Sequence, residues 1–161
     1  DMSKLYFVDG NTSDYSSELD AGLLKGSKGT IPGVNPSDDF IKRLESTGVD
    51  LKNTTTYAAE TYDGIILAAL AAQKGGSADG KTIQANMAAV SGADGGEKCD
   101  SYKACLALLK DGKDIQYQGQ TGIGPFNKNN DPSSANIGVY TFDGDNKPVF
   151  DHTQSGDVPT D

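Results

Sequence analysis

The chain has 161 residues, a formal net charge of −9 at pH 7 and a sequence pI near 4.4. This acidity makes a broad cationic surface unexpected, so we expect no nucleic-acid partner. No apolar run reaches the roughly 18 residues that a membrane-spanning helix needs. With 20 glycines and no tryptophan, the composition favours a loop-rich α/β protein of one domain or two small lobes.

Short apolar runs separated by turn residues characterise the first part of the chain. Residues 4–8 are aromatic and β-branched, which predicts a buried strand that ends in a turn at Asp9. Residues 13–24 are expected to be helical. A brief strand is expected over 29–33, and a helix over about 37–46 has two aspartates in its first turn.

The longest periodic segment runs from Asn53 to Gly76 and is rich in alanine. Asn53 and the three threonines after it offer N-caps, and two glycines end the segment. Steps of three and four residues separate the apolar side chains that we expect on its buried face: Ala58, Tyr62, Ile65, Ile66, Ala69 and Ala72. The segment is therefore predicted to be a buried central helix.

Two further helices are predicted in the middle of the chain. Asp79 is the expected N-cap of a helix that ends at Gly92, and a second helix covers about 101–110. The residues between them, 94–98, are rich in glycine and predict a loop.

The last part of the chain has a β-like texture. We expect strands over 122–126 and 137–142, joined as a hairpin by the turn-rich segment 127–134. A second turn over 143–147 precedes a short apolar pair, and the tail from Asp151 is expected to be frayed.

Residues 75–82 satisfy the phosphate-loop pattern G-x-x-x-x-G-K-[ST]. A phosphate loop must follow a strand directly, so that its amides converge on the phosphates at the start of the next helix. The segment before Gly75 is instead predicted to be helical. We therefore favour a helix-to-helix connection in which Asp79 is the N-cap, and keep a nucleotide-binding protein as a remote alternative.

Metal and catalytic chemistry have little support in the sequence. His152 is the only histidine, and no cysteine or histidine lies near it in the chain. The Asn/Asp-rich segment 127–131 lacks the glycine and the terminal glutamate of a calcium loop. We expect no metal, no cofactor and no enzymatic activity.

Six motifs, in their order and spacing, resemble the C-terminal half of branched-chain amino-acid ABC transporter substrate-binding proteins of the actinobacterial type. They are Leu-Tyr-Phe-Val-Asp-Gly-Asn (5–11), Gly-Ser-Lys-Gly-Thr-Ile-Pro-Gly (26–33), Thr-Tyr-Ala-Ala-Glu-Thr-Tyr-Asp-Gly (56–64), Ser-Gly-Ala-Asp-Gly-Gly-Glu-Lys-Cys (91–99), Gly-Lys-Asp-Ile-Gln-Tyr-Gln-Gly (112–119) and Asn-Asp-Pro-Ser-Ser (130–134). The resemblance covers about Leu5 to Phe150. It implies part of a type I periplasmic-binding-protein fold, with two three-layer α/β lobes and a C-terminal hairpin.

In that family the chain crosses between the lobes three times. The resemblance assigns residues 1–30 to the second lobe, 31–134 to the first lobe, and 135–161 to a strand that returns to the second lobe. Family members are about twice as long, which implies that this chain is a fragment without the first strands of either lobe. The sheet edges left open must be paired or covered, so we expect self-association of the fragment or rearranged strands.

The resemblance also assigns a ligand site. An acidic residue at the position of Asp9 binds the ammonium group of the ligand in the family, and an aromatic ring at the position of Tyr57 packs near its side chain. A turn aspartate and a core-packing tyrosine are the alternatives. Ser13, Asp14 or Glu18 could replace Asp9 only if the following helix turned toward the cleft.

An extracytoplasmic protein with two cysteines six residues apart suggests a disulfide between Cys99 and Cys105. Six residues along a helix rise about 9 Å, which exceeds the roughly 7 Å limit for bonded cysteines. Cys99 must then precede the helix, with Asp100 or Ser101 as N-cap. Two free thiols in a cytosolic protein are the alternative.

The function implied is non-enzymatic capture of an amino acid, branched-chain or similar, for the membrane permease of an ABC importer, through closure of two lobes. The parent protein would be lipid-anchored at the cell surface or in the periplasm. An extracellular sensor domain of the same fold is the alternative.

Overall fold

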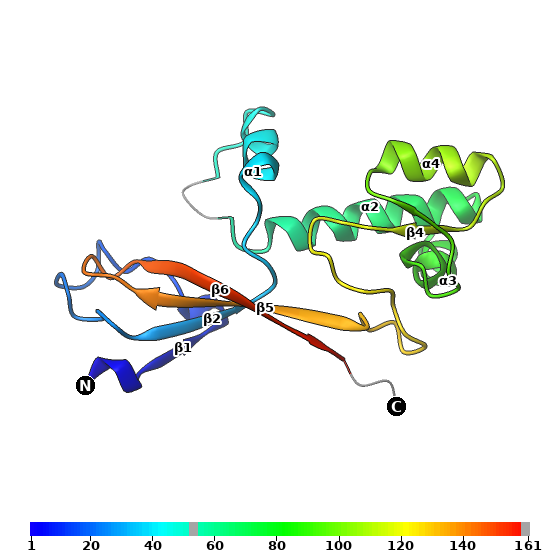
Figure 1. Ribbon diagram of the computed structural model, residues 1–161. Helices are drawn as coiled ribbons and strands as arrows, with labels where there is room; N and C mark the ends of the chain where they lie inside the picture. Colours follow the sequence, from blue (N-terminus) through cyan, green and yellow to red (C-terminus); the bar gives the residue numbers. More distant parts are fainter. Residues whose placement is uncertain (52–54, 159–161) are drawn as a thin grey trace. The chain divides into compact units, whose positions relative to one another are not determined.

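The computed structural model describes residues 1–51 and 55–158, and it has a mixed α/β architecture. These residues form four α-helices, a four-stranded sheet and a two-stranded sheet (Figure 1). The chain divides into two compact units, the first formed by Asp1–Tyr57 with Asn136–Ser155 and the second by Ala58–Ala135 with the residues from Gly156 onward. The predicted α/β class is confirmed, whereas the periplasmic-binding-protein fold and its lobe boundaries stay predictions. Among the described residues, no helix combines the length and the apolarity that crossing a membrane requires.

The larger sheet has the order β1-β2-β5-β6. Its strands are β1 (Tyr6–Val8), β2 (Lys28–Pro32), β5 (Ser134–Phe142) and β6 (Pro148–Asp157). β1 is parallel to β2, with Val8 opposite Thr30, and β2 is antiparallel to β5, with Thr30 opposite Val139. β5 and β6 are neighbours in a long hairpin (Figure 1). The sheet is therefore mixed, and its register relates the end of β1 to the middle of β5.

The prediction that the first strand is buried is wrong. β1 is the outer strand of the sheet, and the side chains of Tyr6 and Val8 are 66% and 60% exposed. Only one face of β1 packs on the unit: the ring of Phe7 lies 4.9 Å from that of Phe142 and 6.1 Å from that of Tyr15. An outer strand of this kind can pair with another chain, so self-association stays a prediction.

The helix predicted over 13–24 is absent, and the segment folds as a series of turns. The buried side chain of Asn146 takes over the hydrogen bonds that a helix would have made. Its Oδ1 accepts from Leu24 N at 2.9 Å, and its Nδ2 donates to the carbonyls of Leu19 at 3.3 Å and Asp20 at 2.9 Å. A tertiary contact has overridden the local pattern.

The brief strand and the helix predicted next are confirmed. β2 covers Lys28–Pro32, and α1 covers Asp38–Glu45. The Ser37 hydroxyl caps α1 by accepting from Phe40 N at 3.3 Å. The Phe40 side chain is 2% exposed and anchors the helix in the first unit.

The central helix is confirmed as α2, Ala58–Gly75, but its buried face is not the predicted one. The buried residues are Ala59, Asp63, Leu67, Leu70 and Ala71. Ile65, expected on the buried face, is 64% exposed. The buried face carries the Asp63 carboxylate, and a hydropathy pattern assigns charged side chains to the exposed face. The proposed caps Asn53 and Thr54 lie outside the described residues.

The next two helices begin at the predicted caps. α3 (Gly80–Ser91) starts after Asp79 and ends at Gly92, whose φ of 99° is the left-handed conformation that favours glycine. α4 (Tyr102–Lys110) starts after Ser101. The core of the second unit forms between these helices and α2, from Leu67, Leu70, Ala71, Val90, Cys99, Cys105, Ile115 and Tyr117.

Three predictions for the second half of the chain need correction. β3 (Glu97–Cys99) takes up the end of the predicted loop 94–98, and it pairs in parallel with β4 (Ile115–Tyr117), which was not predicted. Residues 122–126 form no strand, and the predicted hairpin is reduced to one bridge between Phe126 and Pro132. The reason is that β5 pairs with β2 and β6 instead. The tail is not frayed at Asp151, since β6 continues to Asp157.

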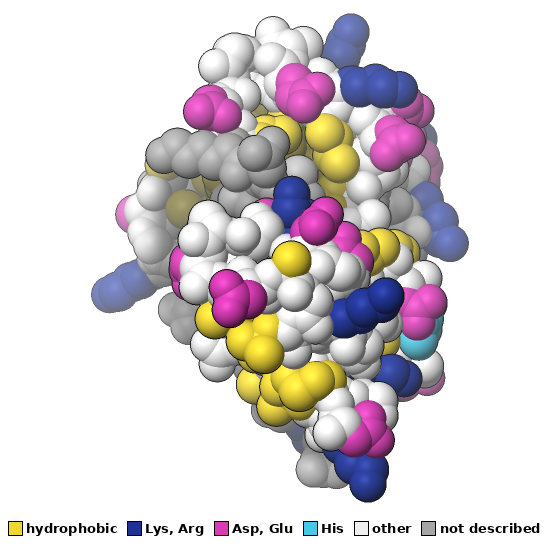
Figure 2. Space-filling model, turned by 90° about the vertical axis from the view of Figure 1, so that its left-hand side faces the viewer, with side chains coloured by type: hydrophobic (Ala, Val, Ile, Leu, Met, Phe, Trp, Pro, Cys, Tyr) yellow, Lys and Arg dark blue, Asp and Glu magenta, His cyan; other side chains and the backbone are white. Residues whose placement is uncertain are grey.

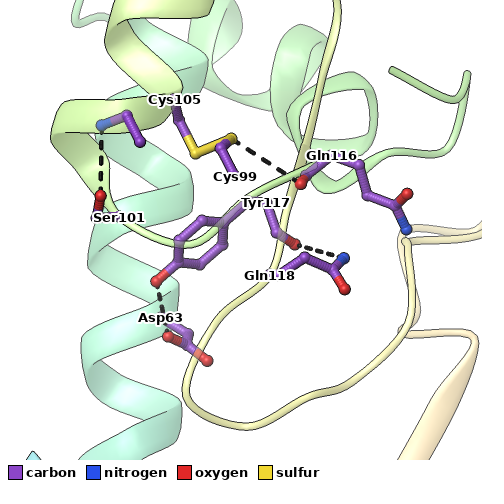
Figure 3. Close-up of a disulfide and its surroundings, with 8 residues drawn as sticks. Asp63, Cys99, Ser101, Cys105, Gln116, Tyr117 and Gln118 are labelled. Atoms are coloured by element: carbon purple, nitrogen blue, oxygen red, sulfur yellow. Dashed lines mark hydrogen bonds between the residues drawn. A yellow bond between two sulfur atoms is a disulfide. The ribbon is translucent and has the colours of Figure 1, made fainter. Parts of the chain in front are cut away.

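A disulfide joins Cys99 and Cys105, whose Cα atoms are 5.3 Å apart. Cys99 ends β3 and precedes α4, as predicted, and the Ser101 hydroxyl accepts from Ala104 N at 3.3 Å (Figure 3). The bond ties the two-stranded sheet to the first turn of the helix. Both cysteines are buried.

A buried carboxylate fixes the segment that follows β4. Asp63 is 4% exposed and accepts from the Tyr117 hydroxyl at 2.9 Å, as Figure 3 shows. It also accepts from Gln120 N at 2.9 Å and from both the backbone N and the hydroxyl of Thr121 at 2.8 Å. Four donors compensate the desolvation of this charge. The backbone of Gly119 passes directly over it.

We expect Gly119→Ala to destabilise the second unit. An added Cβ would lie 2.2 Å from the Asp63 carboxylate, so either the backbone or the hydrogen-bonded carboxylate must shift. The expected loss is roughly 1–3 kcal/mol. Gly144→Ala is the control, because nothing lies within 4 Å of the added atom. Urea unfolding of both variants is the measurement, and equal midpoints would contradict the packing described for Gly119.

Reduction of the disulfide should lower the free energy of unfolding by about 2 kcal/mol, because the unfolded chain regains the entropy that the bond removes by closing a short loop. Urea unfolding with and without reductant measures this difference. Mass spectrometry after alkylation without reductant is the direct check: the Cys99–Cys105 bond requires that no label is incorporated, and two labels would refute it.

Candidate functional site

Asp9 and Tyr57, the two residues assigned to a ligand site, lie in contact with each other. Asp9 begins a single 3-10 turn (Asp9–Asn11) directly after β1, and Tyr57 immediately precedes α2. The Tyr57 hydroxyl donates a hydrogen bond to the Asp9 carboxylate. Both residues belong to the first unit, although 48 positions separate them in the chain.

The backbone at both residues is held in an unusual conformation. Asp9 has a φ of 51° and Tyr57 a φ of 61°, in the left-handed region that side chains other than glycine rarely adopt. Such residues cost of order 1–3 kcal/mol each, persist where the surroundings enforce them, and cluster at binding sites. The conformation aims the two side chains at each other, which supports this pair as a candidate site.

Beside the pair lies an open cleft of about 790 Å³, formed entirely by residues of the first unit. This volume is within the usual range for small-molecule sites. Tyr57 lines the cleft, so the hydroxyl that donates to the Asp9 carboxylate belongs to a residue of the cleft wall. The lining residues are Thr12, Ser13, Asp14, Ile31, Pro32, Gly33, Val34, Asn35, Pro36, Thr55, Thr56, Tyr57, Tyr140, Lys147, Pro148 and Phe150.

The cleft contains an opposite charge pair that the sequence did not single out. Lys147 Nζ lies 4.0 Å from Asp14 Oδ2, and both side chains are about half exposed. The pKa of Asp14 is lowered chiefly by the hydrogen bonds from Ser16, side chain first and then backbone, and least by Lys147. Because 13–24 forms turns instead of a helix, Asp14 reaches the cleft where it was not expected. The only sequence signal that could have pointed to Lys147 as a cleft residue is its place in the predicted turn over 143–147.

The charges elsewhere on the surface form no broad field of one sign on the face seen in Figure 2. Acidic and basic side chains are interspersed there, with apolar side chains exposed between them.

The phosphate-loop pattern in the sequence connects two helices. α2 ends at Gly75 and α3 begins at Gly80, so no strand precedes the loop. The carboxylate of Asp79 occupies the start of α3, where it accepts from Thr82 N at 3.0 Å, the Thr82 hydroxyl at 2.8 Å and the Ser77 hydroxyl at 2.6 Å. The favoured interpretation of Asp79 as an N-cap is confirmed, and the loop lacks the geometry that phosphate binding needs.

Among the described residues, no three or more histidine, cysteine, aspartate or glutamate side chains are grouped so that they could hold a metal ion. His152 lies exposed on β6, with Nδ1 at 3.3 Å from Asp151.

No protein-family model matches the chain, and no curated protein and no solved structure is significantly similar to it. The likeness to amino-acid binding proteins therefore depends on the motifs alone.

Acid should reduce the stabilisation that the Asp79 cap of α3 contributes. The hydrogen bonds from Ser77 and then from Thr82 hold the pKa of Asp79 well below its usual value of 3.8. A lowered pKa in the folded state gives stabilisation that is complete above about pH 5 and is lost as the pH falls below the unfolded value. Asp79→Asn keeps a capping oxygen but does not titrate. We expect the thermal midpoint of the wild type to exceed that of the variant at about pH 7, and the gap to narrow at about pH 2.5. A constant gap would contradict this.

Proposed function

We propose that this chain is the amino-acid-binding part of an extracytoplasmic solute-binding protein that serves an ABC importer. The hydrogen bond between the Tyr57 hydroxyl and the Asp9 carboxylate carries the proposal, since it joins the two residues that the motifs had assigned to the ligand. The proposed ligand has an ammonium group and an apolar side chain of branched-chain type or similar size.

The chemistry of the pair suits an ammonium group. An ammonium has three donors and is costly to bury without a carboxylate partner. A carboxylate offers about four lone-pair sites, so Asp9 can accept from a ligand in addition to Tyr57. The tyrosine hydroxyl restricts the rotation of the carboxylate, which lowers the entropy lost when the ligand binds.

Part of the cleft wall suits an apolar side chain. Ile31, Pro32 and Val34 form one stretch of the lining, and the rings of Tyr140 and Phe150 pack edge to face, with centroids 5.6 Å apart. Polar side chains, among them Thr12, Ser13 and Asn35, line the rest. Small-molecule sites combine apolar surface with placed polar groups.

Delivery to a membrane permease is the favoured role, with a lipid-anchored parent protein outside the membrane and closure of two lobes around the ligand. A sensor domain of the same fold is the second candidate. A lipoprotein-type signal in the parent chain would favour transport, whereas a fused kinase or membrane helix would favour sensing.

Replacing Asp9 with asparagine should weaken ligand binding without unfolding the chain. The side chain is exposed, and the change removes one charge-assisted hydrogen bond. We expect affinity for the best amino acid, found by thermal-shift screening, to fall roughly tenfold to several hundredfold. Calorimetry measures the loss.

Asp20→Asn is the matched control, because Asp20 is also exposed but, unlike Asp9, does not accept the hydrogen bond from the Tyr57 hydroxyl. It should leave affinity unchanged. Unchanged affinity in Asp9→Asn, or a clear loss in Asp14→Asn alone, would place the ammonium site on a different residue.

A further inference from the structure

Two groups that could hold the ends of a ligand adjoin the same cleft. Tyr57, whose hydroxyl is bonded to the Asp9 carboxylate, and Lys147 both line it; Asp9 itself does not line the cleft, and the Asp14 carboxylate lies beside Lys147. Lys147 closes the turn between β5 and β6, where its carbonyl accepts from Asp143 N at 3.0 Å. This turn lies at the left end of the sheet in Figure 1.

The sheet register gives the separation of the two ends. Asp9 follows Val8. Val8 pairs with Thr30 and Thr30 pairs with Val139, so these three residues form one row across the sheet, while Lys147 lies opposite Asp143. Asp9 lies one residue beyond this row on the side away from the turn, so five residues, about 17 Å of strand, separate it from the turn, and three strand spacings between β1 and β6 add about 14 Å sideways. The backbones of Asp9 and Lys147 are therefore on the order of 20 Å apart.

A single amino acid cannot reach both ends. Its ammonium and carboxylate are attached to one carbon atom, whereas an extended chain spans about 3.5 Å per residue. Three residues cover roughly 10 Å, and the side chains of Asp9 and Lys147, with their hydrogen bonds to the ligand, account for the remaining distance. The cleft volume of about 790 Å³ also suits a ligand larger than one amino acid.

The Lys147 side chain is weakly engaged by the protein. Its nitrogen is 4.0 Å from the Asp14 carboxylate, at the limit of an ion pair, and half of the side chain is exposed. A carboxylate from a ligand can approach to a normal hydrogen-bonding distance and compete for this cation.

We propose that the ligand is a short apolar peptide, with its N-terminal ammonium on Asp9 beside Tyr57 and its C-terminal carboxylate on Lys147. The inference rests on the proposed function, because it uses the same ammonium site. Between the two ends, the apolar side chains contact Ile31 and the ring pair of Tyr140 and Phe150.

Calorimetry of the full chain with leucine, tri-leucine and tri-leucine amide tests the proposal. We expect tri-leucine to bind at least tenfold more tightly than leucine. Lys147→Met keeps the aliphatic stem and should weaken tri-leucine about fivefold to tenfold while leaving leucine unchanged. Lys25→Met is the control, since Lys25 is exposed and does not line the cleft.

The amide distinguishes a direct contact from an indirect one. It should bind the wild type as weakly as tri-leucine binds Lys147→Met, and Lys147→Met should not weaken the amide further. Equal affinity for leucine and tri-leucine, with Asp9 dependence retained, overturns the peptide proposal alone. Loss of Asp9 dependence overturns the proposed function, and absence of binding by all three probes overturns both.

Discussion

The buried side-chain amide of Asn146 is the contact on which the first unit depends. Its three hydrogen bonds go to the backbone of 19–24, and its own carbonyl accepts from Tyr15 N at 3.2 Å. One side chain thus joins the β5–β6 turn to an irregular segment more than 120 residues away in the chain. With no exposed surface, the amide would be costly to leave unpaired, so these contacts form together.

This contact also shapes the candidate site. The segment held by Asn146 brings Tyr15 onto the rings of Phe7 and Phe142 and brings Asp14 to the cleft. Lys147 follows Asn146 directly and lines the cleft, with Nζ 4.0 Å from the Asp14 carboxylate. Asp9 and Tyr57, whose side chains are hydrogen-bonded to each other, both have a left-handed backbone. The site is built on positions where regular structure ends.

In the second unit, a buried carboxylate plays the part that the Asn146 amide plays in the first. Asp63 projects from the regular helix α2, accepts one hydrogen bond from Tyr117 in β4, and holds the irregular residues after β4 through three more. The disulfide holds the other side of the two-stranded sheet by joining β3 to α4. In both units, a buried polar side chain fixes a segment that has few backbone hydrogen bonds of its own.

The sequence by itself determined the elements whose signals are local. Ser37, Asp79 and Ser101 cap the helices that follow them because a side-chain oxygen reaches an amide three residues ahead. The disulfide was predicted from an extracytoplasmic protein with two cysteines, and local spacing added that Cys99 must precede the helix. Tertiary structure decided the rest. The turns at 13–24 replaced a helix where the Asn146 side chain bonds to the backbone of Leu19, Asp20 and Leu24, in addition to the turns' own backbone hydrogen bonds. The buried face of α2 shifted because Asp63 found four donors from distant residues. The cleft required Lys147, in the turn between β5 and β6, and Tyr57, which precedes α2, on one surface, and no local signal in the sequence relates residues so far apart in the chain.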